Sequence, residues 1–158
     1  MTEDYLQIMV ESLQKKNDVL DKITELEKRQ LTLALKQPPD LEAYDALMDV
    51  KGNLIDELGR LDDGFTHTYE LVKDEVQKNP HQYQEQVHAM QELICAAIEK
   101  GVSIEAQEQR NKQAMQNMLR TKRVEIKQVK VSNSAASQYY KAMSRINNID
   151  PQLMDRKN

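Results

Sequence analysis

Apolar residues recur at intervals of three and four along most of the chain, which is the spacing of one face of an α-helix. The first such stripe predicts a helix over residues 4–36, and it comprises Leu6, Met9, Leu13, Leu20, Ile23 and Leu26. Lys16 and Asn17 interrupt the stripe, so the packing face of this helix is imperfect. Pro38 and Pro39 end the helix, because proline has no amide hydrogen with which to continue it.

A second helix is predicted over residues 41–78. Asp40 is a suitable N-cap, since its carboxylate can accept a hydrogen bond from the amide of Glu42 or Ala43. The stripe comprises Leu47, Leu54, Leu58, Leu61, Phe65, Tyr69, Val72 and Val76. Three glycines, at positions 52, 59 and 64, lie inside it. Either the helix tolerates them, at a cost of about 1 kcal/mol each relative to alanine, or it bends near Gly64, or they allow a neighbour to pack closely.

A third helix is predicted over residues 80–130, with Asn79 as its cap and Pro80 as its first residue. Its packing face comprises Tyr83, Val87, Met90, Ile94, Ala97 and Ile104, widened by Leu93 and Ile98. After Ile104 the pattern thins to Met115, Met118 and Leu119. A continuous helix of this range is about 75 Å long. We therefore expect its first half to pack and its second half to project beyond the other helices.

These patterns predict an all-α fold: an elongated antiparallel bundle of three long helices in residues 1–131, followed by a C-terminal tail, residues 132–158, that contains a short amphipathic helix. Short connections favour antiparallel neighbours. Composition agrees, because 158 residues include only four glycines, four prolines and no tryptophan. Such a chain has little material for strands and tight turns.

Charge is distributed unevenly along the chain. Residues 1–108 carry 11 Lys and Arg against 23 Asp and Glu, whereas residues 109–158 carry 11 against 3. Cys95 is the only cysteine, which excludes an internal disulfide and favours a reducing compartment. The N-terminus is acidic and no apolar run is long enough to cross a bilayer, so we expect a cytoplasmic protein without membrane insertion.

Few residues are arranged for catalysis or metal binding. His81, Glu85 and His88 share one face of the third helix, but a solvated polar face explains them better than a metal site. Cys95 lies among apolar residues, where a buried side chain is the simpler interpretation. The four glycines stand apart, so no phosphate-binding loop is present. The sequence predicts no enzyme, no metal and no cofactor.

The positive segment from residue 110 to residue 130 has three interpretations. Its lysines and arginines could hold phosphates, but it has no aromatic residue for stacking on bases, and we expect no nucleic-acid partner. Positive charge also suits the C-terminal end of a helix dipole. The third interpretation is an electrostatic surface for an acidic protein, including this chain's own acidic part.

The tail carries a second, shorter stripe. Tyr139, Tyr140, Met143 and Ile146 recur at helical spacing after the segment Ser132-Asn-Ser-Ala-Ala-Ser137. This stripe either folds back on the bundle as a fourth helix or binds a partner, and we favour the partner. The candidate binding residues are Ala136, Tyr139, Tyr140, Met143 and Ile146.

Three stretches resemble the flagellar export chaperone FlgN family. Tyr5-Leu-Gln-Ile-Met-Val-Glu-Ser-Leu-Gln14, with Leu20, Ile23 and Leu26, looks like the first helix of that family. Ala43-Tyr-Asp-Ala-Leu-Met-Asp-Val-Lys-Gly-Asn-Leu-Ile-Asp-Glu-Leu-Gly-Arg-Leu61 is similar to the second helix. Ala135-Ala-Ser-Gln-Tyr-Tyr140 and the terminal Asp155-Arg-Lys157 look like the family's tail.

The resemblance implies a cytosolic chaperone of flagellar type III export. Its partners would be the C-terminal helices of hook-associated proteins of the FlgK and FlgL type, which it would keep from premature assembly, and the export gate, to which it would deliver them. The alternative from a different class is a structural coiled-coil or helical adaptor that oligomerises through its helices. A homo-oligomer is compatible with either hypothesis.

Overall fold

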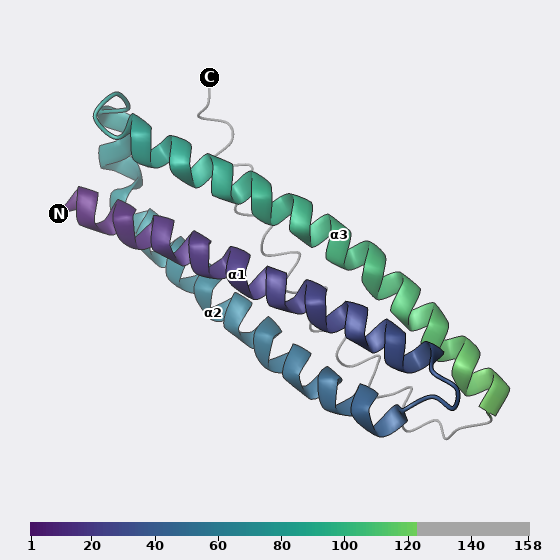
Figure 1. Ribbon diagram of the computed structural model, residues 1–158. Coiled ribbons are helices and arrows are strands. Elements are labelled where there is room, and N and C mark those ends of the chain that lie inside the picture. Colours follow the sequence, from purple (N-terminus) through teal and green to yellow (C-terminus); the bar gives the residue numbers. More distant parts are fainter. Residues whose placement is uncertain (123–158) are drawn as a thin grey trace.

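The computed structural model describes residues 1–122, which form three long α-helices and no strand (Figure 1). The helices are α1 (Thr2–Leu35), α2 (Leu41–Lys78) and α3 (Gln84–Lys122). Consecutive helices run antiparallel, so α1 and α3 run in the same direction (Figure 1). The predicted all-α bundle is confirmed for these residues. The tail, residues 132–158, lies outside the described part.

Two of the predicted helices agree closely with the structure. The range of α2 is the predicted one, and the Asp40 carboxylate accepts a hydrogen bond of 3.0 Å from the amide of Ala43, which confirms the predicted cap. The first helix begins at Thr2 rather than at residue 4 and ends at Leu35. It ends because Lys36 takes an extended backbone conformation ahead of the prolines.

The predicted start of the third helix is wrong. Asn79 ends α2, because its amide donates to the carbonyl of Glu75, and the residues from Pro80 to Tyr83 form a turn before α3 begins at Gln84. The turn is needed to reverse the chain, and Tyr83 is buried within it. The carbonyl of Tyr83 then accepts from the amide of Val87 and so opens α3. The part of the prediction beyond residue 122 lies outside the described residues.

Helix α1 is the central helix of the bundle. Its backbone packs closely on both α2 and α3, whereas no Cα atom of α2 comes within 8 Å of a Cα atom of α3. Packed helices usually have axes 8–10 Å apart. A side-chain contact between α2 and α3 therefore needs long side chains. Lys51 of α2 and Glu108 of α3 are long enough to make one, as described below.

Three apolar clusters follow one another along the bundle. The first, where α2 turns into α3, contains Leu6, Met9, Val10, Leu13, Phe65, Tyr69, Val72, Val76, Tyr83, Met90 and Ile94. The second contains Val19, Leu20, Ile23, Ile55, Leu58, Ala97 and Ile104. The third contains Ala34, Tyr44, Met48, Met115, Met118 and Leu119. Because residues of α3 as late as Leu119 pack on α1 and α2, the predicted projection of α3 beyond Ile104 is wrong within the described range.

The predicted packing face of α2 is only partly correct. Leu58, Phe65, Tyr69, Val72 and Val76 are buried as expected, but Leu47, Leu54 and Leu61 are half-buried. The positions that enter the core instead are Tyr44, Met48 and Ile55. Two apolar stripes lie side by side on this helix. Leu54 and Leu61, chosen from the sequence, pack at the margin of the second cluster rather than inside it.

Both long glycine-containing helices are continuous. Helix α2 passes through all three of its glycines and α3 passes through Gly101, so the glycines cause no break. Gly64 is exposed, and a Cβ atom added to it would meet no heavy atom within 4 Å. The packing of the described residues therefore gives no reason for glycine at this position.

We expect Gly64→Ala to stabilise the protein by about 0.5–1 kcal/mol, because alanine has the higher helix propensity and the added methyl group meets open space. Urea denaturation followed by circular dichroism measures the change. A loss of stability would show that the backbone at Gly64 is strained in a way that only glycine allows.

Candidate functional site

The binding residues predicted from the sequence, Ala136, Tyr139, Tyr140, Met143 and Ile146, lie outside the described residues. The structure places part of the positive segment before them. Arg110 and Arg120 are exposed on α3 and Lys112 is half-buried. The described part of the chain contains two other candidate sites, a buried polar cluster and a surface pocket.

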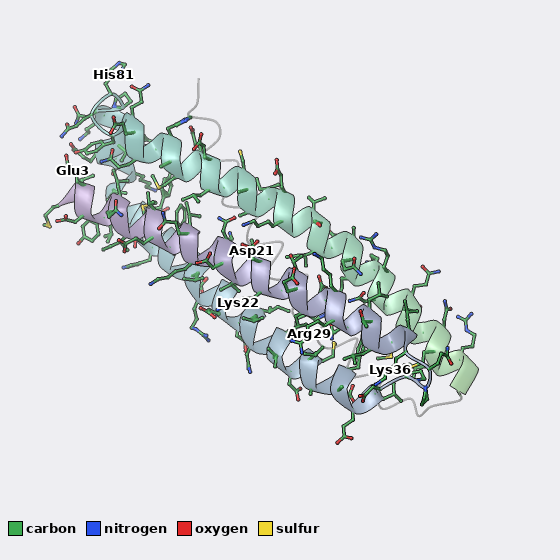
Figure 2. All side chains as sticks on the ribbon, viewed as in Figure 1. Glu3, Asp21, Lys22, Arg29, Lys36 and His81 are labelled. Carbon is green, nitrogen blue, oxygen red and sulfur yellow. The ribbon has the colours of Figure 1, made fainter. Side chains whose placement is uncertain are left out.

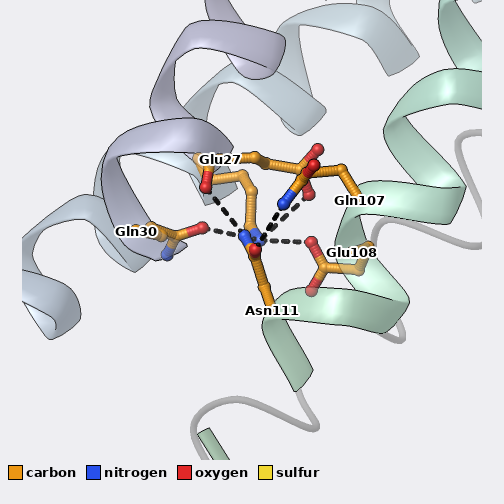
Figure 3. Close-up of polar contacts among 6 residues, drawn as sticks. Glu27, Gln30, Gln107, Glu108 and Asn111 are labelled. Atoms are coloured by element: carbon orange, nitrogen blue, oxygen red, sulfur yellow. Dashed lines mark hydrogen bonds and ion pairs between the residues drawn. The ribbon is translucent and has the colours of Figure 1, made fainter. Parts of the chain in front are cut away.

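The buried cluster has Lys51 of α2 at its centre. The Lys51 Nζ donates hydrogen bonds of 2.6 Å to Glu108 of α3 and 3.2 Å to Gln30 of α1. It also lies 3.7 Å from the carboxyl group of Glu27. Asn111 completes the set by donating a hydrogen bond of 2.9 Å to the backbone carbonyl of Glu27 (Figure 3). We call these five residues the Lys51 cluster, and it joins all three helices.

The two carboxyl groups of the Lys51 cluster carry different charges. Burial, helped by the nearby Glu108, raises the pKa of Glu27 from 4.5 to about 10, so Glu27 is neutral at pH 7. Burial also acts to raise the pKa of Glu108, but the contacts with Glu27 and Lys51 outweigh it and hold that pKa below 4.5. One ammonium group therefore faces one carboxylate, and the cluster has no net charge.

A second, smaller polar set lies nearer to the N-terminus of α1. The buried ammonium of Lys16 is 2.8 Å from the Asp62 carboxylate of α2. Next to it, the Asn17 amide donates to the carbonyls of Leu13, 2.9 Å away, and of Leu93 on α3, 3.1 Å away. Lys16 and Asn17, which interrupt the apolar stripe in the sequence, thus link α1 to both neighbours.

The Lys51 cluster is closed to solvent. The side chains of Lys51 and Glu27 are 0% exposed and that of Glu108 is 7% exposed. A catalytic lysine or carboxyl group must reach its substrate, and here the surrounding side chains exclude one. The cluster is instead suited to fixing how far the helices are shifted along one another, since a shift of seven residues would leave Lys51 facing apolar side chains.

The surface pocket lies between α1 and α2, with a volume of about 250 Å³. Its apolar lining includes Met9, Leu61 and Phe65, and Gly64 contributes bare backbone. The cations of Lys15 and Arg60 also line it. We call it the α1–α2 pocket.

The remaining candidates from the sequence form no site. His88 lies 3.2 Å from Glu92 on an exposed face of α3, and Cys95 is half-buried rather than buried as expected. Among residues 1–122, no three His, Cys, Asp or Glu side chains are grouped so that they could hold a metal ion. No helix in this part combines the length and apolar character needed to span a membrane.

Comparison with known proteins finds no protein-family model, no curated protein and no solved structure that matches this chain. The resemblance to flagellar export chaperones therefore stays a prediction from sequence.

The Lys51 cluster was not predicted from the sequence, although a signal for it was present. Glu27 and Gln30 continue the three- and four-residue spacing of the buried residues of α1, Lys51 does so on α2, and Glu108 and Asn111 do so on α3. A charged residue at an apolar position in each of three helices suggests that the three meet. Which of the many acids faces Lys51 depends on how the helices are aligned.

We expect Glu27→Gln to raise the free energy of unfolding at pH 7, by at most about 3 kcal/mol, because glutamine resembles the neutral carboxyl group already present in the fold and, unlike glutamate, need not take up a proton on folding. Glu108→Gln should cost about 3 kcal/mol, the low end for breaking a buried ion pair, since Glu27 can ionise in its place. Chemical denaturation of both variants tests this. Equal losses would contradict the assignment of the proton to Glu27.

The raised pKa of Glu27 also predicts how stability depends on pH. The folded state holds a proton that the unfolded state releases above pH 4.5, so this contribution is complete below 4.5 and is lost as the pH rises toward about 10. Glu27→Gln does not titrate, so its stability should exceed that of the wild type by an amount that grows by at most about 1.4 kcal/mol per pH unit in that range. Denaturation at pH 5, 7 and 9 measures it, and parallel curves would contradict it.

Proposed function

We propose that this chain is a cytoplasmic chaperone of flagellar type III export. It binds the C-terminal helices of hook-associated proteins of the FlgK and FlgL type, prevents their premature assembly and carries them to the export gate. On this proposal the chain is a binding protein and not an enzyme.

The observation that carries the proposal is the stripe of Tyr139, Tyr140, Met143 and Ile146, together with the resemblance of this part of the chain to the FlgN family. Helices α1, α2 and α3 use their main apolar stripes for their own three clusters. The later stripe repeats the same spacing beyond the described end of α3. A second amphipathic helix, such as the C-terminal helix of a client, is a suitable partner for such a segment.

The residue types in this stripe suit binding. Tyrosine provides a large contact area with only two rotatable side-chain bonds, and aromatic residues dominate the energetics of many interfaces. Methionine adapts its shape to different neighbours. A short stripe also limits the affinity, because few anchors must offset the entropy lost on association. Limited affinity fits a chaperone, which has to release its client at the gate.

The rigid part of the molecule supports this role. The Lys51 cluster joins all three helices at one level, and at a second level the Lys16–Asp62 pair joins α1 to α2 while Asn17 joins α1 to α3. A bundle fixed in this way keeps its three apolar clusters buried whether or not a client is bound to the later stripe.

We expect the double substitution Tyr139→Ala and Tyr140→Ala to weaken binding of a FlgK- or FlgL-type protein at least about 30-fold, as for the loss of an aromatic hot spot of 2 kcal/mol or more. Isothermal titration calorimetry with the purified proteins measures the affinity. The control is Lys141→Gln, which alters the opposite side of the same helical repeat and should bind within about threefold of wild type.

Absence of any affinity of the wild-type chain for such proteins would overturn the proposal. Binding that is unchanged by the tyrosine substitutions would place the client elsewhere on the molecule. Concentration-dependent self-association through the helices, with no client binding, would favour the structural adaptor.

A further inference from the structure

We propose that the α1–α2 pocket is a second docking site, which takes one apolar side chain from a helix of a partner protein and a neighbouring carboxylate of that same helix. The site lies on α1 and α2 and not in residues 132–158. It can therefore be tested independently of the proposed function.

The size of the pocket selects the kind of occupant. Sites for whole small molecules usually have volumes of about 300–1,000 Å³, and the α1–α2 pocket has about 250 Å³. It suits a single large apolar side chain, the kind of anchor on which helical partners depend. Met9 and Phe65 are almost fully buried and form its base, while Ile8, 52% exposed, presents an apolar side chain at its edge.

The presence of glycine at position 64 is a further argument for a docking site here. Glycine disfavours the helix that contains it, and here the described packing does not require it, since an added Cβ atom would meet nothing within 4 Å. What glycine does provide is an open space beside Phe65 and Leu61. An incoming side chain would occupy that space against the bare helix backbone.

The charges around the pocket indicate what accompanies the apolar side chain. Lys15 and Arg60 are exposed at the pocket and form no ion pair in the described part of the chain. Some surface lysines have partners, such as Lys73 with Glu70 at 2.6 Å, whereas others, such as Lys22, form no ion pair in the described part either. The one carboxylate of the pocket, Glu11, accepts a hydrogen bond from Gln7. The two free cations are complementary to an acidic residue.

The form of the surface favours a partner helix over a second copy of this chain. The pocket lies in the seam between two adjacent helices, and such a seam can hold a third helix lying along it. A stable dimer needs about 1,000 Å² or more of buried surface. The other large exposed apolar residues of α1 and α2 are dispersed along the bundle, Val50 and Leu71 of α2 among them, and do not extend the pocket into a patch of that size.

The test uses the full-length protein labelled with ¹⁵N and two synthetic peptides. Each is an alanine-based helix with one phenylalanine, followed four residues later by glutamate in the first peptide and by lysine in the second. We expect the first peptide to shift the amide signals of Ile8, Ser12, Lys15, Gly64 and Thr68 in a saturable way, and the second to bind about three- to tenfold more weakly, as for one or two exposed ion pairs.

Pairs of matched variants, one inside the pocket and one outside it, distinguish a loss of binding at the pocket from a general loss of stability. Gly64→Leu fills the pocket and should abolish the saturable shifts, whereas His67→Leu places the same side chain on an exposed position outside it and should not. Lys15→Glu with Arg60→Glu should reverse the preference for the acidic peptide. Lys22→Glu with Arg29→Glu, which replaces two cations that project from α1 elsewhere, should preserve it (Figure 2). Circular dichroism checks that each variant folds.

Three results would overturn the proposal: no shifts at these amides with millimolar peptide, equal binding of the two peptides, or undiminished binding by folded Gly64→Leu. Shifts of the same amides on concentrating the protein without peptide would show that a second copy occupies the pocket, and would overturn it as well.

Discussion

A buried ammonium group is stable in a helical core only when carboxylates and amides reach it from the surrounding elements, because its transfer out of water is otherwise too costly. Lys51 meets this condition with one partner on α3 and others on α1. The requirement constrains the whole bundle. All three helices must be correctly aligned for the contacts to form, and any shift of one helix leaves a charge without its partner.

This constraint matters most between α2 and α3, whose backbones remain apart while α1 packs on both. Apolar packing of α1 against each neighbour supplies most of the buried surface, but a regular stripe can also pack after a shift of one repeat. The Lys51 cluster and the Lys16–Asp62 pair remove that ambiguity at two separate levels. Burial is also the main reason why Glu27 holds a proton, and the nearby Glu108 adds to it, since a second buried carboxylate would leave the cluster with an excess negative charge.

The interior and the surface of the bundle have different roles. The buried Lys51 cluster fixes the arrangement of the helices, and its Lys51 and Glu27 side chains are closed to solvent. Its surface retains a partly apolar pocket with two cations that form no ion pair within residues 1–122, and the sequence continues after α3 with the stripe proposed to bind clients. The two proposed contacts use different residues, so one partner could be held while a second is engaged.

The sequence by itself determined the fold class, the range of α2 and the cap at Asp40, because helix periodicity, proline and capping side chains act within a few residues. It also located most of the core, but it misjudged the face of α2 at Leu47, Leu54 and Leu61, where two neighbouring stripes are both apolar. Only the tertiary structure decided which acids face Lys51, that Glu27 is protonated, and that Gly64 lies beside an open pocket. These features depend on residues more than 20 positions apart in the chain, and the helix alignment that brings such residues together is set by the bundle as a whole.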